Sequence, residues 1–234
     1  MDAFPPADVI SDHDGARAVR TARRAIARAL GAGSEGARDD DAGPSADPPL
    51  FAEPRGVFVT LRRSGSGALR GCVGYPLPTL PLRSAVERAA VAAAQDDPRF
   101  PPVRATELSG LTVEVSVLTV PQAVPRTSPE ELVRAIRVGR DGLIVDGFGA
   151  SGLLLPQVAT EERWEAEEFL DRTCEKAGLP TTAWRDPRVV IRSFRAEVFS
   201  ESAPGGDVVR FDPGITESGG RSGPGTRSRR SPSS

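Results

Sequence analysis

Residues 111–118 alternate between apolar and polar side chains as far as Val117, and this run constrains the fold more than any other part of the sequence. A period of two is typical of a β-strand that buries one of its faces. The buried face would carry Leu111, Val113, Val115 and Val117, and the opposite face would carry Thr112, Glu114 and Ser116. The run therefore predicts a sheet that packs on a core with one side only.

Two strands joined by a turn are predicted ahead of this run. Residues 56–61 are rich in β-branched and aromatic side chains, and residues 62–68 contain two glycines and two serines, which favour a turn. Residues 69–74, LRGCVG, then form the second arm of a hairpin. The period of two places Arg70, Cys72 and Gly74 on one face of that arm.

Helical spacing and capping residues predict four helices. They are expected over residues 17–30, 79–95, 128–138 and 160–177, with Thr79, Ser128 and Thr160 as N-caps of the last three. The second helix is rich in alanine and is slim enough to lie close to a sheet. A second hairpin is expected from apolar runs at 143–145 and 153–155, and residues 189–199 read as one long strand or two short ones, with the alternation slipping near Ser193.

Three segments have compositions that do not suit a packed core. Residues 1–14 are expected to be a short disordered tail, and residues 31–54, with four prolines and an acidic run, a mobile insertion. Residues 201–234 are rich in Gly, Ser, Pro and Arg and are expected to be a second disordered tail. The folded domain is therefore expected to span residues 15–200.

Charge and composition exclude several classes of function. The 30 basic and 32 acidic residues give a net charge of −2, which argues against specific nucleic-acid binding by the whole surface. The acidic N-terminus lacks the apolar core of a signal peptide, and no run of apolar residues is long enough for a membrane span. Two cysteines far apart in the sequence favour a reduced, cytoplasmic protein.

The single histidine, His13, lies in the predicted N-terminal tail. A histidine-based metal site or a Cys–His dyad is therefore not expected, and no metal ligand set is predicted. Cys174 falls on the apolar face of its helix and is expected in the core.

Cys72 and Arg70 are the candidate catalytic residues. A guanidinium beside a thiol favours the thiolate and also holds anions, and Gly71 and Gly74 would leave room for a ligand or partner. The alternative is a small buried cysteine whose neighbouring glycines make room for the alanine-rich helix.

Three further residues are candidates for a ligand or partner surface. Asp97 and Arg99 would bring an acid and a cation to one edge of the sheet, although a local ion pair in the loop after the helix explains them as well. Glu114 would serve as a base if its carboxylate were partly buried, against the alternative of a solvated sheet face.

The motifs of this chain resemble those of the AMMECR domain family in order and spacing. The matching segments are residues 69–74, 81–82, 97–102, 115–118, 142–144, 154–159 and 176–179, together with Trp164, Phe169, Leu170, Cys174 and Trp184. The resemblance covers roughly residues 15–200. One departure is Asp141, where many relatives have histidine.

The resemblance implies an α+β fold, with a mainly antiparallel sheet flanked by helices and a larger and a smaller lobe. It implies no particular reaction or cofactor. Relatives are associated with MEMO-like proteins and radical S-adenosylmethionine proteins, which implies a shared modification pathway.

Two functions follow from these expectations. The first is a binding or adaptor component that presents the surface around Cys72 to such a partner. The second is an enzyme or enzyme subunit in which Cys72 is the nucleophile or a carrier thiol and Arg70 activates it. Since the folded region is expected to lack histidine, the binding role ranks first.

Overall fold

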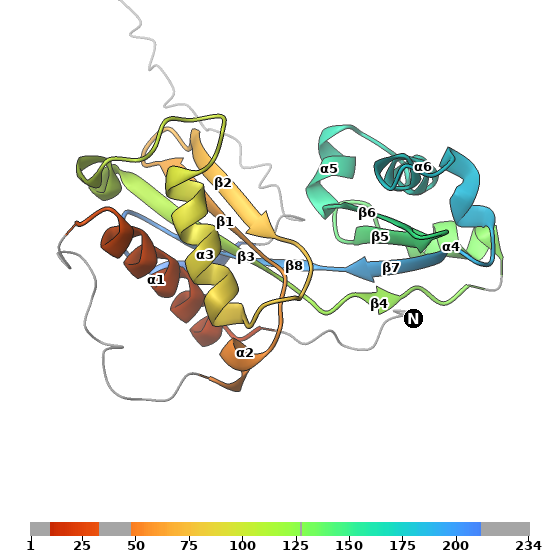
Figure 1. Cartoon of the computed structure of the whole chain (residues 1–234), viewed down its shortest axis with the longest axis horizontal. Helices are drawn as coiled ribbons and strands as arrows, with labels where there is room; N and C mark the ends of the chain where they lie inside the picture. The colour runs from red at the N-terminus through yellow and green to blue at the C-terminus, as the bar shows by residue number, and fades with distance from the viewer. Residues whose placement is uncertain (1–9, 33–47, 127, 212–234) are drawn as a thin grey trace, which may run out of the picture.

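The computed structural model describes residues 10–32, 48–126 and 128–211, which form two lobes, each built on its own sheet (Figure 1). The larger sheet has the strand order β2-β1-β3-β8-β9, and the smaller sheet has the order β4-β7-β5-β6. The strand pairings in both sheets are antiparallel. The α+β class, with a mainly antiparallel sheet flanked by helices, is confirmed.

The elements follow one another along the chain with these bounds. The strands are β1 Val57–Arg63, β2 Leu69–Tyr75, β3 Leu111–Leu118, β4 Gln122–Ala123, β5 Gly142–Gly147, β6 Ala150–Leu154, β7 Val190–Phe194, β8 Ala196–Glu201 and β9 Val208–Phe211. The helices are α1 Asp12–Ala29, α2 Pro49–Ala52, α3 Leu82–Gln95, η2 Ala105–Gly110, α4 Pro129–Ala135, α5 Pro156–Glu161, α6 Ala166–Lys176 and η3 Thr181–Arg185. Within the described residues, none of these helices has the length and apolar character needed to cross a membrane.

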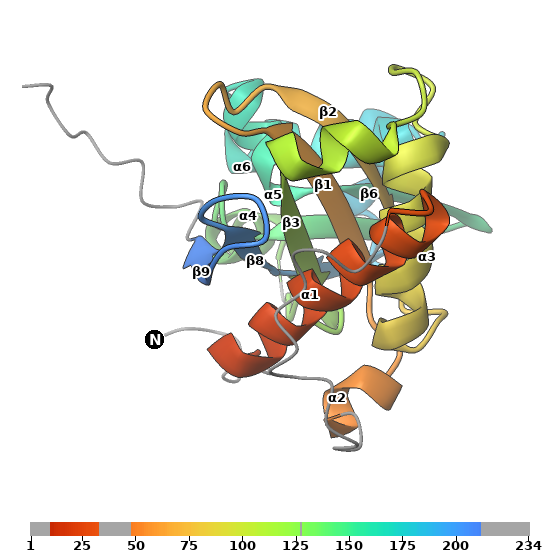
Figure 2. The same ribbon diagram turned by 90° about the vertical axis from the view of Figure 1, so that its left-hand side faces the viewer.

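In the larger lobe, α1 and α3 cover one face of the five-stranded sheet (Figure 2). Helix α3 contacts β1 and β2, and α1 contacts β3, β8 and β9. As the alternation in residues 111–118 predicts, Val113 and Val115 are fully buried beneath the helices, whereas Glu114 and Ser116 on the other face are only half-buried. The sheet therefore has one face covered by helices and one face that they leave open.

The smaller lobe packs α4, α5 and α6 around the four-stranded sheet. Its core contains Trp184, Phe169, Leu132 and Cys174, each with at most 1% of its surface exposed. A third apolar cluster, with Phe194 buried and Phe58 half-buried, contains residues of both lobes and packs them against each other.

The chain passes between the lobes twice, and the two crossings run side by side. The first leads from β3 to β4 and the second from β7 to β8 (Figure 1). At the junction, the backbone N–H of Thr119 donates to the Arg195 carbonyl at 2.9 Å, and the backbone N–H of Arg195 donates to the Thr119 hydroxyl at 2.9 Å. The run 189–199 is thus two short strands in different sheets, and the break falls at Arg195, two residues after Ser193.

Parts of the segments expected to be disordered are ordered. Helix α1 begins at Asp12, because the Ser11 side chain accepts the backbone N–H of Asp14 and caps it. In the expected insertion, Phe51 of α2 is buried in the core of the larger lobe. In the expected C-terminal tail, β9 extends the larger sheet. The rest of these three segments, residues 1–9, 33–47 and 212–234, lies outside the described residues.

Three helix boundaries also differ from expectation. Helix α3 begins after Pro81 rather than Thr79. Helix α4 is capped by Ser128 as predicted, but it ends at Ala135, because Ile136 turns to an extended conformation and buries its side chain in the core. The expected helix 160–177 is two helices, since Arg163 has a positive φ of 59° and interrupts it.

Candidate functional site

Cys72 lies on the open face of the larger sheet, in the edge strand β2. Gly71 faces α3, so the next side chain along the strand points away from the helices. Cys72 pairs with Thr60 of β1, and the Thr60 hydroxyl donates a hydrogen bond to its Sγ at 3.4 Å. Thr60 pairs in turn with Glu114 of β3, which pairs with Ser200 of β8. Directly paired residues share a face, so these four side chains form one polar row across the sheet.

The polar row continues into apolar side chains on β9. Val209 is paired with Ser200, and Phe211 is paired with Val198 in the next row along β8. These two side chains are 52% and 55% exposed. We call the side of the sheet that carries Cys72, Thr60, Glu114, Ser200, Val209 and Phe211 the sheet face. Thr60 is itself buried, with 6% of its surface exposed. Sequence reasoning missed Thr60, Ser200 and the two β9 residues, because only the strand order and register place them on the same face of the sheet as Cys72.

Asp97 and Arg99 complete the outer edge of β2 at Cys72. The Asp97 carboxylate accepts the backbone N–H of Cys72 at 2.8 Å, and an Arg99 Nη2 donates to the Cys72 carbonyl at 3.3 Å. An edge strand leaves such groups without a strand partner, and here the two side chains take that partner's place. The predicted acid and cation at one edge of the sheet are therefore both present.

Asp97 and Arg99 also form the local ion pair that was the alternative explanation. Arg99 Nε lies 3.0 Å from Oδ1 of Asp97, and Nη2 lies 2.8 Å from Oδ2. The hydrogen bond from Arg99 is the main reason that the pKa of Asp97 falls far below its usual value. Asp97 in turn raises the pKa of Arg99, and the Cys72 side chain adds to that rise. The cation beside the thiol is thus Arg99, whose side chain is 54% exposed.

Arg70 does not have the role predicted for it. Its side chain is 4% exposed, and it forms a two-point ion pair with Glu107 of η2, with Nε to Oε1 and Nη2 to Oε2 both at 3.2 Å. Arg70 is the main reason that the pKa of Glu107 is lowered. The register between β1 and β2 shifts at Arg70, which has no paired residue on β1. A bulge of this kind interrupts the alternation of faces and re-aims the side chain, here toward η2. Arg70 joins β2 to η2, and Arg99 stands in its place as the cation at Cys72.

Gly71 and Gly74 make room for the protein itself rather than for a ligand. A Cβ on Gly71 would lie 2.1 Å from the Ala93 carbonyl oxygen of α3, so this glycine lets the alanine-rich helix approach, as the alternative explanation states. A Cβ on Gly74 would lie 2.3 Å from the Phe58 ring. The space beside Gly74 is therefore filled by the ring that helps to join the two lobes.

The Glu114 carboxylate is partly buried, which is the condition under which we expected it to serve as a base. Its side chain is 18% exposed, and burial raises the pKa of its carboxyl, although Arg62 at 3.6 Å acts in the opposite direction. Burial also raises the pKa of the Cys174 thiol, which lies in the core of the smaller lobe as expected. Within residues 10–32, 48–126 and 128–211, no cluster of three or more potential metal ligands occurs.

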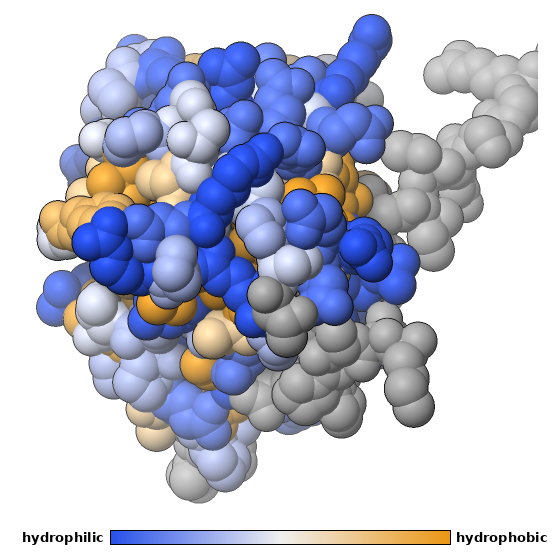
Figure 3. All heavy atoms as spheres, turned by 90° about the vertical axis from the view of Figure 1, so that its right-hand side faces the viewer, coloured by the Kyte–Doolittle hydropathy of each residue, from blue (hydrophilic) through white to orange (hydrophobic). Residues whose placement is uncertain are grey.

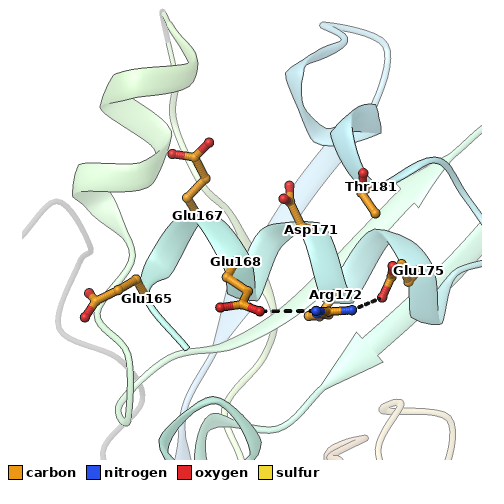
Figure 4. A pocket seen from close by; sticks show the side chains of 7 residues that line it. All are labelled: Glu165, Glu167, Glu168, Asp171, Arg172, Glu175 and Thr181. Atoms are coloured by element: carbon orange, nitrogen blue, oxygen red, sulfur yellow. Dashed lines mark hydrogen bonds and ion pairs between the residues drawn. The ribbon is translucent and has the colours of Figure 1, made fainter. Parts of the chain in front are cut away.

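A separate hollow of about 450 Å³ lies on α6 of the smaller lobe (Figure 4). Its lining residues are Glu165, Glu167, Glu168, Asp171, Arg172, Glu175 and Thr181. Arg172 bridges Glu168 and Glu175, and Asp171 accepts the Trp184 indole N–H at 2.6 Å. This acidic hollow shares no residue with the sheet face. Figure 3, which looks at the molecule from the side of the smaller lobe, shows a mostly hydrophilic surface with scattered apolar residues.

The order and spacing of the motifs, together with the two-lobed fold, agree with a known family. Residues 19–199 match the family model described as AMMECR1. The chain belongs to the AMMECR1 family. The matched segment contains Cys72, Thr60 and Glu114 of the sheet face and the edge residues Asp97 and Arg99. Ser200, Val209 and Phe211 lie beyond its end.

Archaeal members of the AMMECR1 family are close in sequence. A protein of Thermofilum pendens is 50% identical over 208 residues, which cover 86% of this chain and 95% of the relative. Protein PF1979 of Pyrococcus furiosus is 50% identical over 204 residues, which cover 86% and 94%. The crystal structure of protein PH0010 from Pyrococcus horikoshii shares 48% identity and a TM-score of 0.68, over 87% of this chain and 98% of that one. The names of these AMMECR1 relatives state no activity.

Proposed function

We propose that this AMMECR1 family chain is a binding component of a modification pathway, and that it presents the sheet face to a protein partner. The partner class is a MEMO-like protein, acting with a radical S-adenosylmethionine protein. The observation that carries the proposal is the sheet face itself. It lies opposite α1 and α3 and carries a thiol, a hydroxyl, a carboxylate and two exposed apolar side chains.

The composition of the sheet face suits a protein partner. Val209 and Phe211 supply exposed apolar area, and the row from Ser200 to Cys72 borders it with polar groups. Exposed apolar side chains with a polar rim are typical of interaction surfaces. The edge of β2 is held by Asp97 and Arg99, so the thiol is presented on backbone that is already ordered.

Binding is tested by mixing the purified chain with a MEMO-like protein from the same source. Complex formation is followed by size-exclusion chromatography and calorimetry. We expect Val209→Asp to weaken the complex at least about tenfold, because a charge would replace buried apolar area. Val190→Asp is the matched control, since Val190 is a similarly exposed strand valine on the smaller lobe. A wild-type chain that forms no complex, or equal losses in both variants, would contradict the proposal.

A second function is supported by the surroundings of the thiol. Cys72 Sγ accepts from Thr60, and the exposed Arg99 guanidinium lies beside it. In this enzyme or enzyme subunit, Cys72 is the nucleophile or carrier thiol and Arg99 is its cation. Glu114, a bound cofactor or a partner residue would accept the proton.

Cys72→Ala separates the two functions. In a binding component, the variant still forms the complex and supports the modification carried out by the reconstituted partners. In a thiol enzyme, the complex forms but the modification stops. Mass spectrometry of the wild-type chain after the reaction would then detect an adduct on Cys72.

A further inference from the structure

The two outer edges of the larger sheet differ, and the difference shows where the sheet can be extended. At the β2 edge, the Asp97 and Arg99 side chains already bind the backbone N–H and C=O of Cys72. At the other edge, no strand of the described residues pairs with the outer side of β9. We propose that β9 pairs with the β9 strand of a second copy of this chain, so that two larger sheets join into one. This inference goes beyond the proposed function and does not rest on it.

The backbone of β9 presents hydrogen-bonding groups outward. At the turn before β9, the backbone N–H of Ser202 donates to the Asp207 carbonyl at 2.8 Å, so these two residues form a hydrogen-bonded pair. Hydrogen-bonded and non-hydrogen-bonded pairs alternate along an antiparallel ladder, so the backbone of Val209 also bonds to β8. Val208 and Arg210 therefore point their N–H and C=O groups away from β8. An edge of this kind is a template for another strand.

Two copies of β9 match each other in an antiparallel register centred on Val209. Val208 of each copy then forms a hydrogen-bonded pair with Arg210 of the other copy. The two Val209 residues lie opposite each other in a non-hydrogen-bonded pair, in which the Cα atoms approach to about 4.5 Å and the side chains touch. This contact uses the same strand of both copies and is two-fold symmetric, as in most homodimers.

Neighbouring registers are less favourable. A shift of two residues in one direction would place the two Arg210 side chains opposite each other, and like charges in that position destabilise a strand pair. A shift in the other direction would pair Phe211 with Gly205, a turn residue with a φ of 69°. The register centred on valine avoids both conflicts, and Asp12 and Glu197 balance the Arg210 charge within its own chain.

The pairing also explains where the exposed apolar side chains of β9 lie. Val209 and Phe211 are 52% and 55% exposed, and they occupy the last strand of the sheet, at the margin of the larger lobe (Figure 2). In the joined sheet, Phe211 of each copy is diagonal to Val209 of the other, within reach of an aromatic ring. Pairing therefore removes from water part of the apolar area that a single chain exposes, which favours association.

The size of the contact predicts a weak dimer. Each copy contributes a strand of four residues, whereas a standard interface takes about 20 to 30 residues from each side. Analytical ultracentrifugation of the full-length chain measures the association. The mean mass should rise from 24.7 kDa toward twice that value between about 1 µM and about 1 mM chain. Over the same range, the amide protons of Val208 and Arg210 should exchange more slowly with solvent, because they become hydrogen-bonded.

Charges introduced at Val209 test the two-fold register. Val209→Lys alone and Val209→Asp alone should each weaken the dimer about tenfold or more, because like charges then lie opposite each other. An equimolar mixture of the two variants should regain the dimer, because a lysine then faces an aspartate. Val190→Lys, at an exposed strand valine of the smaller lobe, is the control and should dimerise like the wild type. Melting temperatures check that all variants are folded.

A wild-type chain that keeps the mass of a single chain at about 1 mM overturns the proposal. A dimer that Val209→Lys leaves intact, or a mixture of the two variants that stays monomeric, also overturns it. If the wild type is monomeric and Val209→Lys abolishes binding of the MEMO-like protein, the β9 edge belongs to that partner rather than to a second copy. The mass measurements contain no partner protein, so a failure of the dimer leaves the proposed function standing.

Discussion

The Asp97 carboxylate accepts the backbone N–H of Cys72 at 2.8 Å, across 25 residues of sequence. The same carboxylate is paired with Arg99 through both of its oxygens. One acidic side chain thus orders the edge strand beneath the thiol and also fixes the cation beside it. The stability of the larger lobe and the chemistry of its open face depend on the same contact.

Replacing Asp97 by Asn should destabilise the chain by about 2 kcal/mol near neutral pH, because charge-assisted hydrogen bonds are lost. The pKa of Asp97 lies below its usual value of 3.8 in the folded state. Its contribution is therefore fully present above that value and is lost as the pH falls below it. Urea unfolding of the wild type and of Asp97→Asn is measured from about pH 7 to about pH 2. The difference between their free energies of unfolding should shrink in acid. A difference in the free energy of unfolding that grows in acid would contradict the stabilising role of the ionised Asp97 carboxylate.

Replacing Gly71 by Ala should destabilise the chain by about 2 kcal/mol or more, since the added methyl group would collide with α3. A Cβ at this position lies 2.1 Å from the Ala93 carbonyl oxygen, and backbone atoms yield only if the helix moves. Gly110→Ala is the matched control, because a Cβ there meets no atom within 4 Å. Thermal unfolding of both variants checks the comparison, and equal melting temperatures would show that α3 moves without cost.

Arg70→Gln should lower stability but leave the rate at which iodoacetamide alkylates Cys72 in the folded chain unchanged. The substitution breaks the two-point pair with Glu107, and removing one partner of a largely buried pair costs about 3 kcal/mol. Arg99→Gln should have the opposite profile, with a larger effect on the alkylation rate than on stability, because it removes the cation nearest the thiol. The measurements are the melting temperature and the rate at which iodoacetamide alkylates Cys72 in the folded chain. If Arg70→Gln slowed this reaction and Arg99→Gln did not, Arg70 would be the cation at the thiol.

Glu114→Gln should make the chain more stable near neutral pH. The pKa of Glu114 is raised above its usual 4.5 by burial, so the folded state favours the protonated form. Stability linked to that protonation is present at low pH and is lost as the pH rises through the folded pKa. A neutral glutamine avoids this loss, so its advantage should be seen at about pH 8 and should vanish by about pH 4. Chemical unfolding at these two pH values measures it.

Much of the larger lobe is predictable from local patterns. The alternation around Val113 and Val115 indicates which strand face is buried, and the glycines and serines of residues 62–68 mark the turn between β1 and β2. In the smaller lobe, the predicted N-cap of α4, Ser128, is also confirmed. The sequence also indicates Asp97, Arg99 and Glu114 as candidates for a ligand or partner surface, because charged side chains next to or within predicted strands can be recognised from the sequence.

What local patterns miss depends on distant partners. The period of two places Arg70 and Cys72 on one face, but it cannot show that the register with β1 shifts at Arg70, whose side chain pairs with Glu107. The break at Arg163 has no glycine or proline to announce it. Strand β9 follows a polar, glycine-rich stretch, and only its pairing with β8 makes it a strand.

The paired crossings at Thr119 and Arg195 have a consequence for how the molecule is assembled. Residues 120–194 leave and re-enter the larger lobe at two backbone positions that are already hydrogen-bonded to each other. The smaller lobe is therefore an insertion between β3 and β8. These two antiparallel neighbours could also be joined directly by a tight turn. Trimming the gene to join Thr119 to Arg195 through a short turn should leave the sheet that carries Cys72 continuous, with Phe58 newly exposed where the smaller lobe had covered it.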